Sequence, residues 1–390
     1  MWYHIYEAQM QASAPFRAAA LAALQMRPAL HGAADTPYAR QLMAALEMAT
    51  RAKLTHESQP FGIKSVTVEN REALVAEETA LDLPFGRMLH FRKDIDAPQP
   101  RVLIVAPLSG HFATLLRNTV KTMLQDHDVY ITDWKNARNV PLAQGRFGFE
   151  EYVDYLIKML EHLGPGTHLV AVCQPCVQAM VATAVMAASK NKCEPRSLTL
   201  MAGPIDCRIN PTAVNNLATD HPIEWFRNNL ISTVPFPLPA WGRRVYPGFM
   251  QLAAFISMNP ERHLEQHKTL YRHLVEGEED EAERIKTFYD EYFAVLDLTG
   301  PRPVVLRAGQ QGPQPVGLGR GERRRIDAQL TQERASLARQ PIFTVEQCQR
   351  RLTRGREGDR GWHIHRPASR TVVPPAATSA SRAASAVAKG

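Results

Sequence analysis

The chain has 390 residues, 45% of them hydrophobic, which is enough for one large domain with appendages or for two domains. Five cysteines, an odd number, argue against a disulfide framework and favour a reducing compartment, so we expect a cytoplasmic protein. The sequence contains no apolar run approaching the roughly 18 residues of a membrane helix and no signal-peptide pattern, so no transmembrane segment is expected.

The net charge of +7 is unevenly distributed along the chain. Residues 1–300 hold 29 basic and 33 acidic residues, whereas residues 301–390 hold 17 basic residues, 16 of them Arg, and 6 acidic ones. A uniformly basic surface would indicate a nucleic-acid-binding protein, but the body of this chain is mildly acidic, so we expect no nucleic-acid partner. The composition of residues 300–390 predicts a basic, low-complexity, disordered tail.

Residues 1–60 are expected to form a helical segment. Ala, Leu and Met dominate there, and Leu42, Met43, Leu46 and Ala49 fall on one helical face. Such a face is typical of a helix packed on a core. The alternative is an amphipathic surface that contacts an apolar polymer or a membrane interface.

From residue 61 onward, strand and helix patterns alternate. Strands are expected at 65–69, 88–91, 102–106, 129–132, 168–172 and 197–201, and helices at 112–125, 149–163 and 175–189. Alternation of this kind with short loops predicts an α/β core with a mainly parallel sheet over residues 61–213, covered by helices.

Residues 214–299 interrupt the alternation. They contain helical stretches and aromatic-rich loops but no clear strand, which predicts a helical cap over the carboxyl edge of the sheet. The aromatic side chains of this segment either contact an apolar substrate or form the core of the cap. They are Trp225, Phe226, Phe236, Trp241, Tyr246 and Phe249.

The stretch LVAVCQPCVQAM, residues 169–180, predicts a strand, a tight turn and a helix. Cys173 and Cys176 could be a redox pair of the thioredoxin type, a buried inert pair, or a nucleophile followed by a packing residue. The thioredoxin fold places its motif after an early strand, whereas several strands and two helices come first here, and a zinc site would need a second ligand pair. The pattern therefore favours Cys173 as a nucleophile on a sharp elbow, although Pro175 stands where Gly is usual.

Such a nucleophile needs donors for the oxyanion that forms when it attacks a carbonyl group. The N–H of Gln174, at the helix start, can supply one donor. The loop after strand 102–106 can supply the other, from Leu108 or Ser109.

Five motifs together resemble the intracellular polyhydroxyalkanoate depolymerases, which are relatives of the polyhydroxyalkanoate synthases. They are APLSGHFATLLRNTV (106–120), DVYITDW (128–134), VCQP (172–175), MAGPIDCRINPTAVN (201–215) and GRRVYPGF…MNPERH (242–263). The resemblance covers about residues 1–299. It implies an α/β-hydrolase fold, Cys173 as nucleophile, cleavage of poly(3-hydroxybutyrate), and a location on storage granules. No cofactor or metal is expected.

The resemblance stops after FAVLDLT, residues 293–299. The family's triad also has an Asp and a His near the C-terminus, and neither the strand nor the Gly-His turn that carries them is recognisable here. A reading-frame change near residue 300 would explain the loss, and a genuine basic tail that binds nucleic acid or granules is the alternative. Asp206 and His111 are the candidate substitutes for the acid and the base, although a loop-capping Asp206 and a loop-shaping His111 are the simpler interpretations. Loss of the Asp and the His would inactivate a depolymerase, so we expect this chain to bind polyester far better than it degrades it. A non-catalytic granule-binding protein and a synthase-like acyltransferase remain alternative functions, and the oligomeric state is not predicted.

Overall fold

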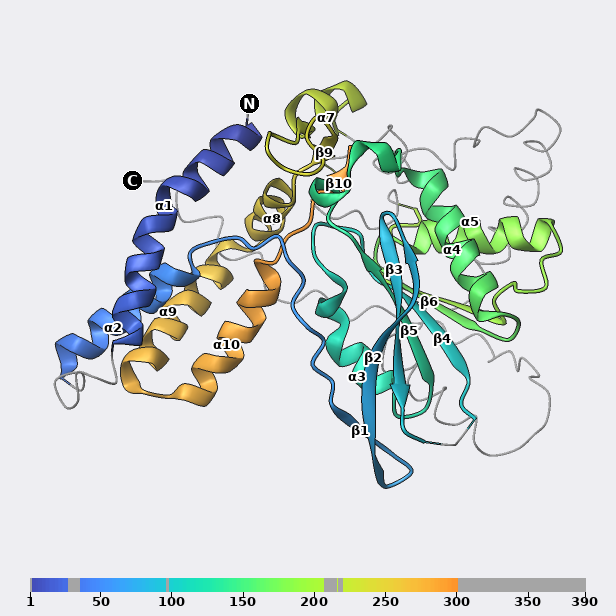
Figure 1. Ribbon diagram of the computed structural model, residues 1–390, viewed down its shortest axis with the longest axis horizontal. Helices are drawn as coiled ribbons and strands as arrows, with labels where there is room; N and C mark the ends of the chain where they lie inside the picture. Colours follow the sequence, from blue (N-terminus) through green and yellow to red (C-terminus); the bar gives the residue numbers. More distant parts are fainter. Residues whose placement is uncertain (1, 27–35, 96–97, 207–215, 217–219, 301–390) are drawn as a thin grey trace, which may run out of the picture. The chain divides into compact units, whose positions relative to one another are not determined.

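The computed structural model describes residues 2–26, 36–95, 98–206, 216 and 220–300 (Figure 1). All of them belong to one of two compact units, Met1–Val345. The predicted tail lies outside the described residues, apart from Gly300. Within the described ranges, no helix is long and apolar enough to cross a membrane.

The unit is built around a seven-stranded sheet in the spatial order β1-β2-β3-β5-β4-β6-β7. The strands are β1 (Ser65–Val68), β2 (Arg71–Leu83), β3 (Gly86–Lys93), β4 (Arg101–Val105), β5 (Asp128–Trp134), β6 (His168–Val172) and β7 (Ser197–Met201). Neighbours β5, β4, β6 and β7 are parallel, and β2 runs in the same direction, so only β1 and β3 are reversed.

Helices cover both faces of this sheet. α4 (Phe149–Leu163) and α5 (Cys176–Ala188) pack on one face, where Leu103 and Leu169 point. A 3-10 turn (Ala113–Leu116) and α3 (Arg117–Met123) cover the other face, where Ile104 points. β4 and β6 are almost entirely buried because helices cover both of their faces. Their sequences are therefore nearly continuous apolar runs. The strand order and the covering helices confirm the expected α/β-hydrolase fold.

The remaining described elements are mostly helical. They are α1 (Trp2–Gln25), α2 (Pro37–Arg51), α7 (Ile223–Asn229), α8 (Gly248–Ser257), α9 (Pro260–Glu276), α10 (Glu279–Tyr292) and the short strands β8 (Ser232–Thr233), β9 (Arg244–Tyr246) and β10 (Leu298–Thr299). The prediction that residues 214–297 contain no strand is wrong, because β8 and β9 lie there and pair with β10 in a separate sheet. Strands of two or three residues are too short for an alternating pattern to show.

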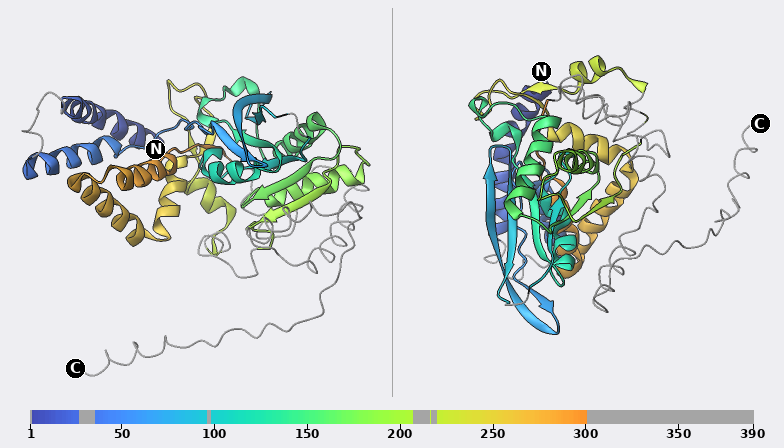
Figure 2. Two further views of the ribbon diagram at one scale, coloured as in Figure 1. Left: turned by 90° about the horizontal axis from the view of Figure 1, so that it is seen from below. Right: turned by 90° about the vertical axis from the view of Figure 1, so that its right-hand side faces the viewer.

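The N-terminal helices and the last two cap helices pack together in one layer. α1 packs on α2, and α2 packs on α9, which packs on α10. Arg51 Nη1 lies 2.6 Å from an Asp290 oxygen, and Lys286 Nζ lies 3.3 Å from a Glu47 oxygen, so ion pairs also join α2 to α10. Figure 2 shows these four helices beside the sheet rather than across one of its faces.

A buried polar network ties the start of α1 to the end of the cap. The Tyr3 hydroxyl donates to Asp297, and the other Asp297 oxygen accepts from the Gly248 N–H at 2.8 Å. Burial raises the pKa of Asp297, and the two hydrogen bonds counteract that rise. Arg138, itself buried, forms an ion pair with Glu7 at 2.8 Å. Residues 3, 7, 138 and 297 therefore fix α1 against the core.

Candidate active site

Cys173 occupies a strained turn between the central strand β6 and helix α5. β6 ends at Val172 and α5 begins at Cys176, which confirms the expected position of the turn. Cys173 has φ +67°, a conformation that few residues other than glycine adopt. Its N–H donates to the Met201 carbonyl at 2.8 Å, and its own carbonyl accepts from the Cys176 N–H at 3.1 Å. A nucleophile elbow has this geometry: the chain reverses sharply and presents one side chain at the carboxyl edge of the sheet.

The neighbouring turn after β7 is shaped to lie against the elbow. Ala202 also has a positive φ, of +53°. A Cβ added to Gly203 would overlap the Cys176 side chain and lie 3.0 Å from the Cys173 carbonyl oxygen. Glycine at position 203 therefore permits the close approach of the two turns. Sequence reasoning assigned no role to this residue, although it lies in the motif MAGP.

Cys176 is a packing residue, as its place in the helix suggests. Its side chain is fully buried, and its Sγ lies 3.3 Å from the Ala171 carbonyl oxygen and 3.6 Å from that of Met201. Burial raises the pKa of the Cys176 thiol to about 12, so the thiol stays protonated at neutral pH. Cys173 is half-buried, and both cysteines are free thiols. The two sulfurs thus occupy different environments, which favours nucleophilic rather than redox chemistry.

The loop that follows β4 lies beside the elbow. β4 and β6 are parallel neighbours with Val105 opposite Ala171, so the chain leaves both strands at the same edge of the sheet. In this loop Leu108 packs against two core clusters and Ser109 is buried. The indole N–H of Trp134 donates to the Ala106 carbonyl at 3.1 Å, which holds the start of the loop. The sheet therefore brings Leu108, Ser109 and Gln174 to the edge that carries Cys173.

His111 lies among aromatic side chains of the cap helices. Only 6% of it is exposed, and its ring centre lies 5.0 Å from that of Tyr292 and 5.5 Å from that of Phe255. Burial lowers the pKa of His111 to about 4, against a hydrogen bond to the Tyr292 backbone that favours the charged form. Its Nε2 has no hydrogen-bond partner among the described residues, so this nitrogen does not bond to Cys173. These surroundings favour the loop-shaping interpretation of His111.

Asp206 is half-buried in the described segment that follows β7. This segment ends at Asp206, and residues 207–215 lie outside the described part of the chain. The position after a central parallel strand is the one expected from the sequence. A catalytic role for Asp206 stays a prediction.

A polar pocket of about 880 Å³ opens at the carboxyl end of β5. Asp133, 5% exposed, is part of its lining, and two guanidinium N–H groups of Arg87 donate to Asp133 Oδ2 at 2.8 Å each. Burial raises the pKa of Asp133, and Arg87 counteracts the rise. Cys173 does not line this pocket. Sequence reasoning missed it because its residues come from five separate segments.

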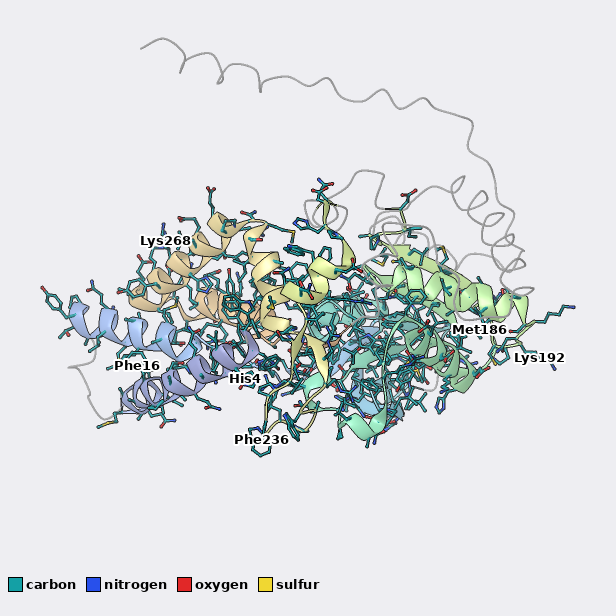
Figure 3. The ribbon with its side chains drawn as sticks, turned by 90° about the horizontal axis from the view of Figure 1, so that it is seen from above. His4, Phe16, Met186, Lys192, Phe236 and Lys268 are labelled. Atoms are coloured by element: carbon teal, nitrogen blue, oxygen red, sulfur yellow. The ribbon has the colours of Figure 1, made fainter. Side chains whose placement is uncertain are left out.

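The aromatic residues of the cap divide into two groups. Phe226 is buried, and Phe249 stacks on Tyr6 with ring centres 4.3 Å apart, so these two belong to the protein interior. Phe236 and Trp241 are 76% and 62% exposed and form an edge-to-face pair with ring centres 6.0 Å apart. Figure 3 shows Phe236 projecting from the surface. Phe226 and Phe249 therefore belong to the cap core, Trp225 and Tyr246 are half-buried, and contact of Phe236 and Trp241 with an apolar substrate stays a prediction.

One group of side chains within the described ranges has the composition and spacing to hold a metal ion. It consists of His273, Glu276 and Glu278, around the end of α9, with His273 in direct contact with Glu278. All three belong to the helical layer and none to the elbow. Exposed acidic groups of this kind are common without a metal ion.

Comparison with known proteins finds a family match near the end of the described chain. Residues 202–301 match the family model described as "PHB de-polymerase C-terminus".

These residues are similar to the C-terminal part of PHB depolymerases.

The family match confirms the resemblance read from the motifs, and it ends two residues after the last residue of FAVLDLT. A search of curated proteins finds no match.

Several solved structures are similar over part of the chain. A thioesterase domain from the curacin biosynthetic pathway is 16% identical over 37% of this chain and 50% of its own, with a TM-score of 0.25. Naproxen esterase from Bacillus subtilis is 13% identical over 41% and 55%, with a TM-score of 0.27. A putative epoxide hydrolase from Pseudomonas aeruginosa is 12% identical over 68% and 76%, with a TM-score of 0.29. The chain thus spans about half the length of the first two, and TM-scores this low carry no argument about function.

Proposed function

We propose that the protein is an ester hydrolase that cleaves poly(3-hydroxybutyrate) with Cys173 as its nucleophile. The observation that supports this proposal most directly is the φ of +67° at Cys173, on the turn between β6 and α5. Such strain persists where the surrounding structure holds it, and it clusters at functional sites. The family match to residues 202–301 supports the choice of a polyester substrate.

In the proposed reaction, the Cys173 sulfur attacks the carbonyl carbon of a backbone ester. The S–C bond forms, the C–O bond to the departing hydroxyl group breaks, and the thiol proton ends on that hydroxyl. The developing oxyanion accepts hydrogen bonds from the Gln174 N–H and from the loop of Leu108 and Ser109. Water then attacks the thioester, which releases the free acid and returns a proton to the sulfur.

The proposal includes a location on storage granules in the cytoplasm, where the polymer is the partner. The exposed pair of Phe236 and Trp241 offers apolar contact of the kind that an amorphous polyester surface would meet. No metal or cofactor takes part in the proposed mechanism.

The test uses an activated butyrate ester and the full chain. We expect mass spectrometry to find one butyryl group on Cys173, no adduct in Cys173→Ala, and an unchanged adduct in Cys176→Ser. The matched pair is informative because both cysteines lie within four residues, yet only Cys176 is fully buried. A label on Cys176, or labelling that survives Cys173→Ala, would contradict the assignment.

A second assay measures 3-hydroxybutyrate release from amorphous granules. Because the acid and the base expected near the C-terminus are not recognisable, we expect slow release by the parent chain and none by Cys173→Ala. Granule binding without release or acylation would instead support the non-catalytic granule-binding alternative. Consumption of a hydroxyacyl-CoA with chain growth would support the synthase-like alternative.

A further inference from the structure

A second pocket lies within the helical layer, between the N-terminal helices and the last cap helices. Its volume is about 900 Å³, and its walls come from α1, α2, α9 and α10 and from the chain that follows α2. The walls are mainly apolar, with Leu24, Met48, Leu270 and Phe293 among the lining side chains. Leu21, on the α1 wall, is 50% exposed. The pocket is therefore an apolar groove that water reaches, here called the helical groove.

Four cationic side chains line the helical groove, and only two of them are neutralised. Arg51 pairs with Asp290 and Glu47, and Lys286 pairs with Glu47 and Glu283. Among the residues that the structure describes, by contrast, no carboxylate lies within ion-pair distance of Arg17 or Lys53.

Arg17 is half-buried and directs its two terminal nitrogens to the Ser13 hydroxyl and the Met10 carbonyl at 2.5 and 2.9 Å. Its charge is thus hydrogen-bonded but not neutralised. The lining carries four cations against Glu47 and Asp290, and Glu283 beside Lys286 adds a third carboxylate, which leaves an excess of one positive charge.

The same groove contains a buried hydroxyl without a partner. Thr55 Oγ1 is shielded from solvent and makes no hydrogen bond, although its backbone N–H donates to the Phe293 carbonyl at 2.9 Å. The hydroxyl and the two cations lie on one pocket lining together with a long apolar wall.

We propose that the helical groove binds an acyl carboxylate, separately from any substrate of Cys173. The carboxylate would pair with Arg17 and Lys53, and the acyl chain would lie against Leu24, Met48 and Leu270. The positive charge and the apolar wall of the lining together favour an acyl carboxylate as the ligand. A neutral polymer would leave the charges of Arg17 and Lys53 unmatched, and a small hydrophilic anion would leave the apolar wall exposed to water.

The test is a calorimetric titration of the full chain with decanoate, with decanol as the neutral analogue of equal length. Butyrate serves as the short analogue. We expect decanoate to bind at least about tenfold more tightly than either analogue, because one loses the charge-assisted contacts and the other most of the apolar contact. Arg17→Glu should weaken decanoate binding by about tenfold or more.

The matched control is Lys192→Glu, which makes the same charge change on the other side of the sheet from α1 (Figure 3). It should leave decanoate binding unchanged. Equal binding of decanoate and decanol, equal effects of the two charge changes, or the absence of decanoate binding would each overturn the proposal.

Acylation of Cys173 by the activated ester is measured on the same samples. Arg17→Glu should retain it, with an unchanged circular-dichroism spectrum, so loss of groove binding is separated from misfolding. Because the two readouts use different sites, failure of the groove proposal leaves the proposed hydrolase untouched, and the reverse also holds.

Discussion

The buried histidine at position 111 makes the protein sensitive to acid in a way that can be calculated. The pKa of His111 is about 4 in the folded chain, below its ordinary value of 6.5, because burial disfavours the imidazolium. When the pH falls below 6.5, the unfolded chain takes up a proton that the folded chain does not bind. Stability is therefore complete above the unfolded pKa and is lost as the pH falls toward the folded pKa.

The size of the loss follows from these two pKa values. The linkage relation gives a fall of about 2 kcal/mol in the free energy of unfolding between pH 7.5 and pH 5.0 from this residue alone. Replacing His111 by a residue that cannot be protonated should therefore remove the same amount from the pH dependence of the free energy of unfolding. Phenylalanine cannot be protonated, and it suits a site between the rings of Phe255 and Tyr292.

The assay is urea unfolding of the parent, of His111→Phe and of His162→Gln at both pH values. Between pH 7.5 and pH 5.0, the free energy of unfolding of His111→Phe should fall by about 2 kcal/mol less than that of the parent. This difference is expected whatever the stability of the variant at pH 7.5. His56, whose pKa burial lowers to about 3, contributes to parent and variant alike and so cancels. His162 is exposed on α4, and its replacement should leave the parental loss in place. An equal loss in the parent and in His111→Phe would refute the reasoning.

Two further substitutions test contacts on which the site depends. Tyr3→Phe removes the hydroxyl that donates to the buried Asp297, and we expect a loss of about 1–3 kcal/mol in urea unfolding at neutral pH; an unchanged free energy of unfolding would show that this hydrogen bond is not formed. Gly203→Ala places a methyl group on the Cys176 side chain, and we expect about 1–3 kcal/mol of destabilisation together with slower acylation of Cys173. Unaltered acylation kinetics in Gly203→Ala would mean that the elbow does not depend on the close approach of this turn.

The core of the fold follows from the sequence because burial imposes a regular pattern on it. The runs 149–163 and 168–172 were predicted with the bounds that α4 and β6 have in the structure. Fifteen residues with one apolar face, and four consecutive apolar residues in the centre of a sheet, leave little choice of secondary structure. The position of Cys173 follows from the same pattern, because it is the first residue after β6.

Elements without such a pattern were not predictable. β2, with 13 residues, was missed because most of its side chains are exposed on both faces, and its strand conformation depends on pairing with β1 and β3. The expected helix at 112–125 divides into a 3-10 turn and α3. The surroundings of His111 come from α8 and α10, more than 140 residues away in the sequence, so its burial and low pKa could not be inferred from its neighbours in the chain.

The hydrogen bond between Tyr3 and Asp297 joins residues 294 positions apart and therefore constrains the order of events during synthesis. A ribosome adds about 5–20 residues per second, so roughly 15–60 s separate the appearance of the donor from that of its acceptor. During this interval α1 lacks the partner that fixes its first turn, and Trp2, Ile5 and Phe16, exposed even in the finished protein, are available to chaperones or to other nascent chains. Helix α1 is thus synthesised first, but it is among the last elements to make its stabilising contacts.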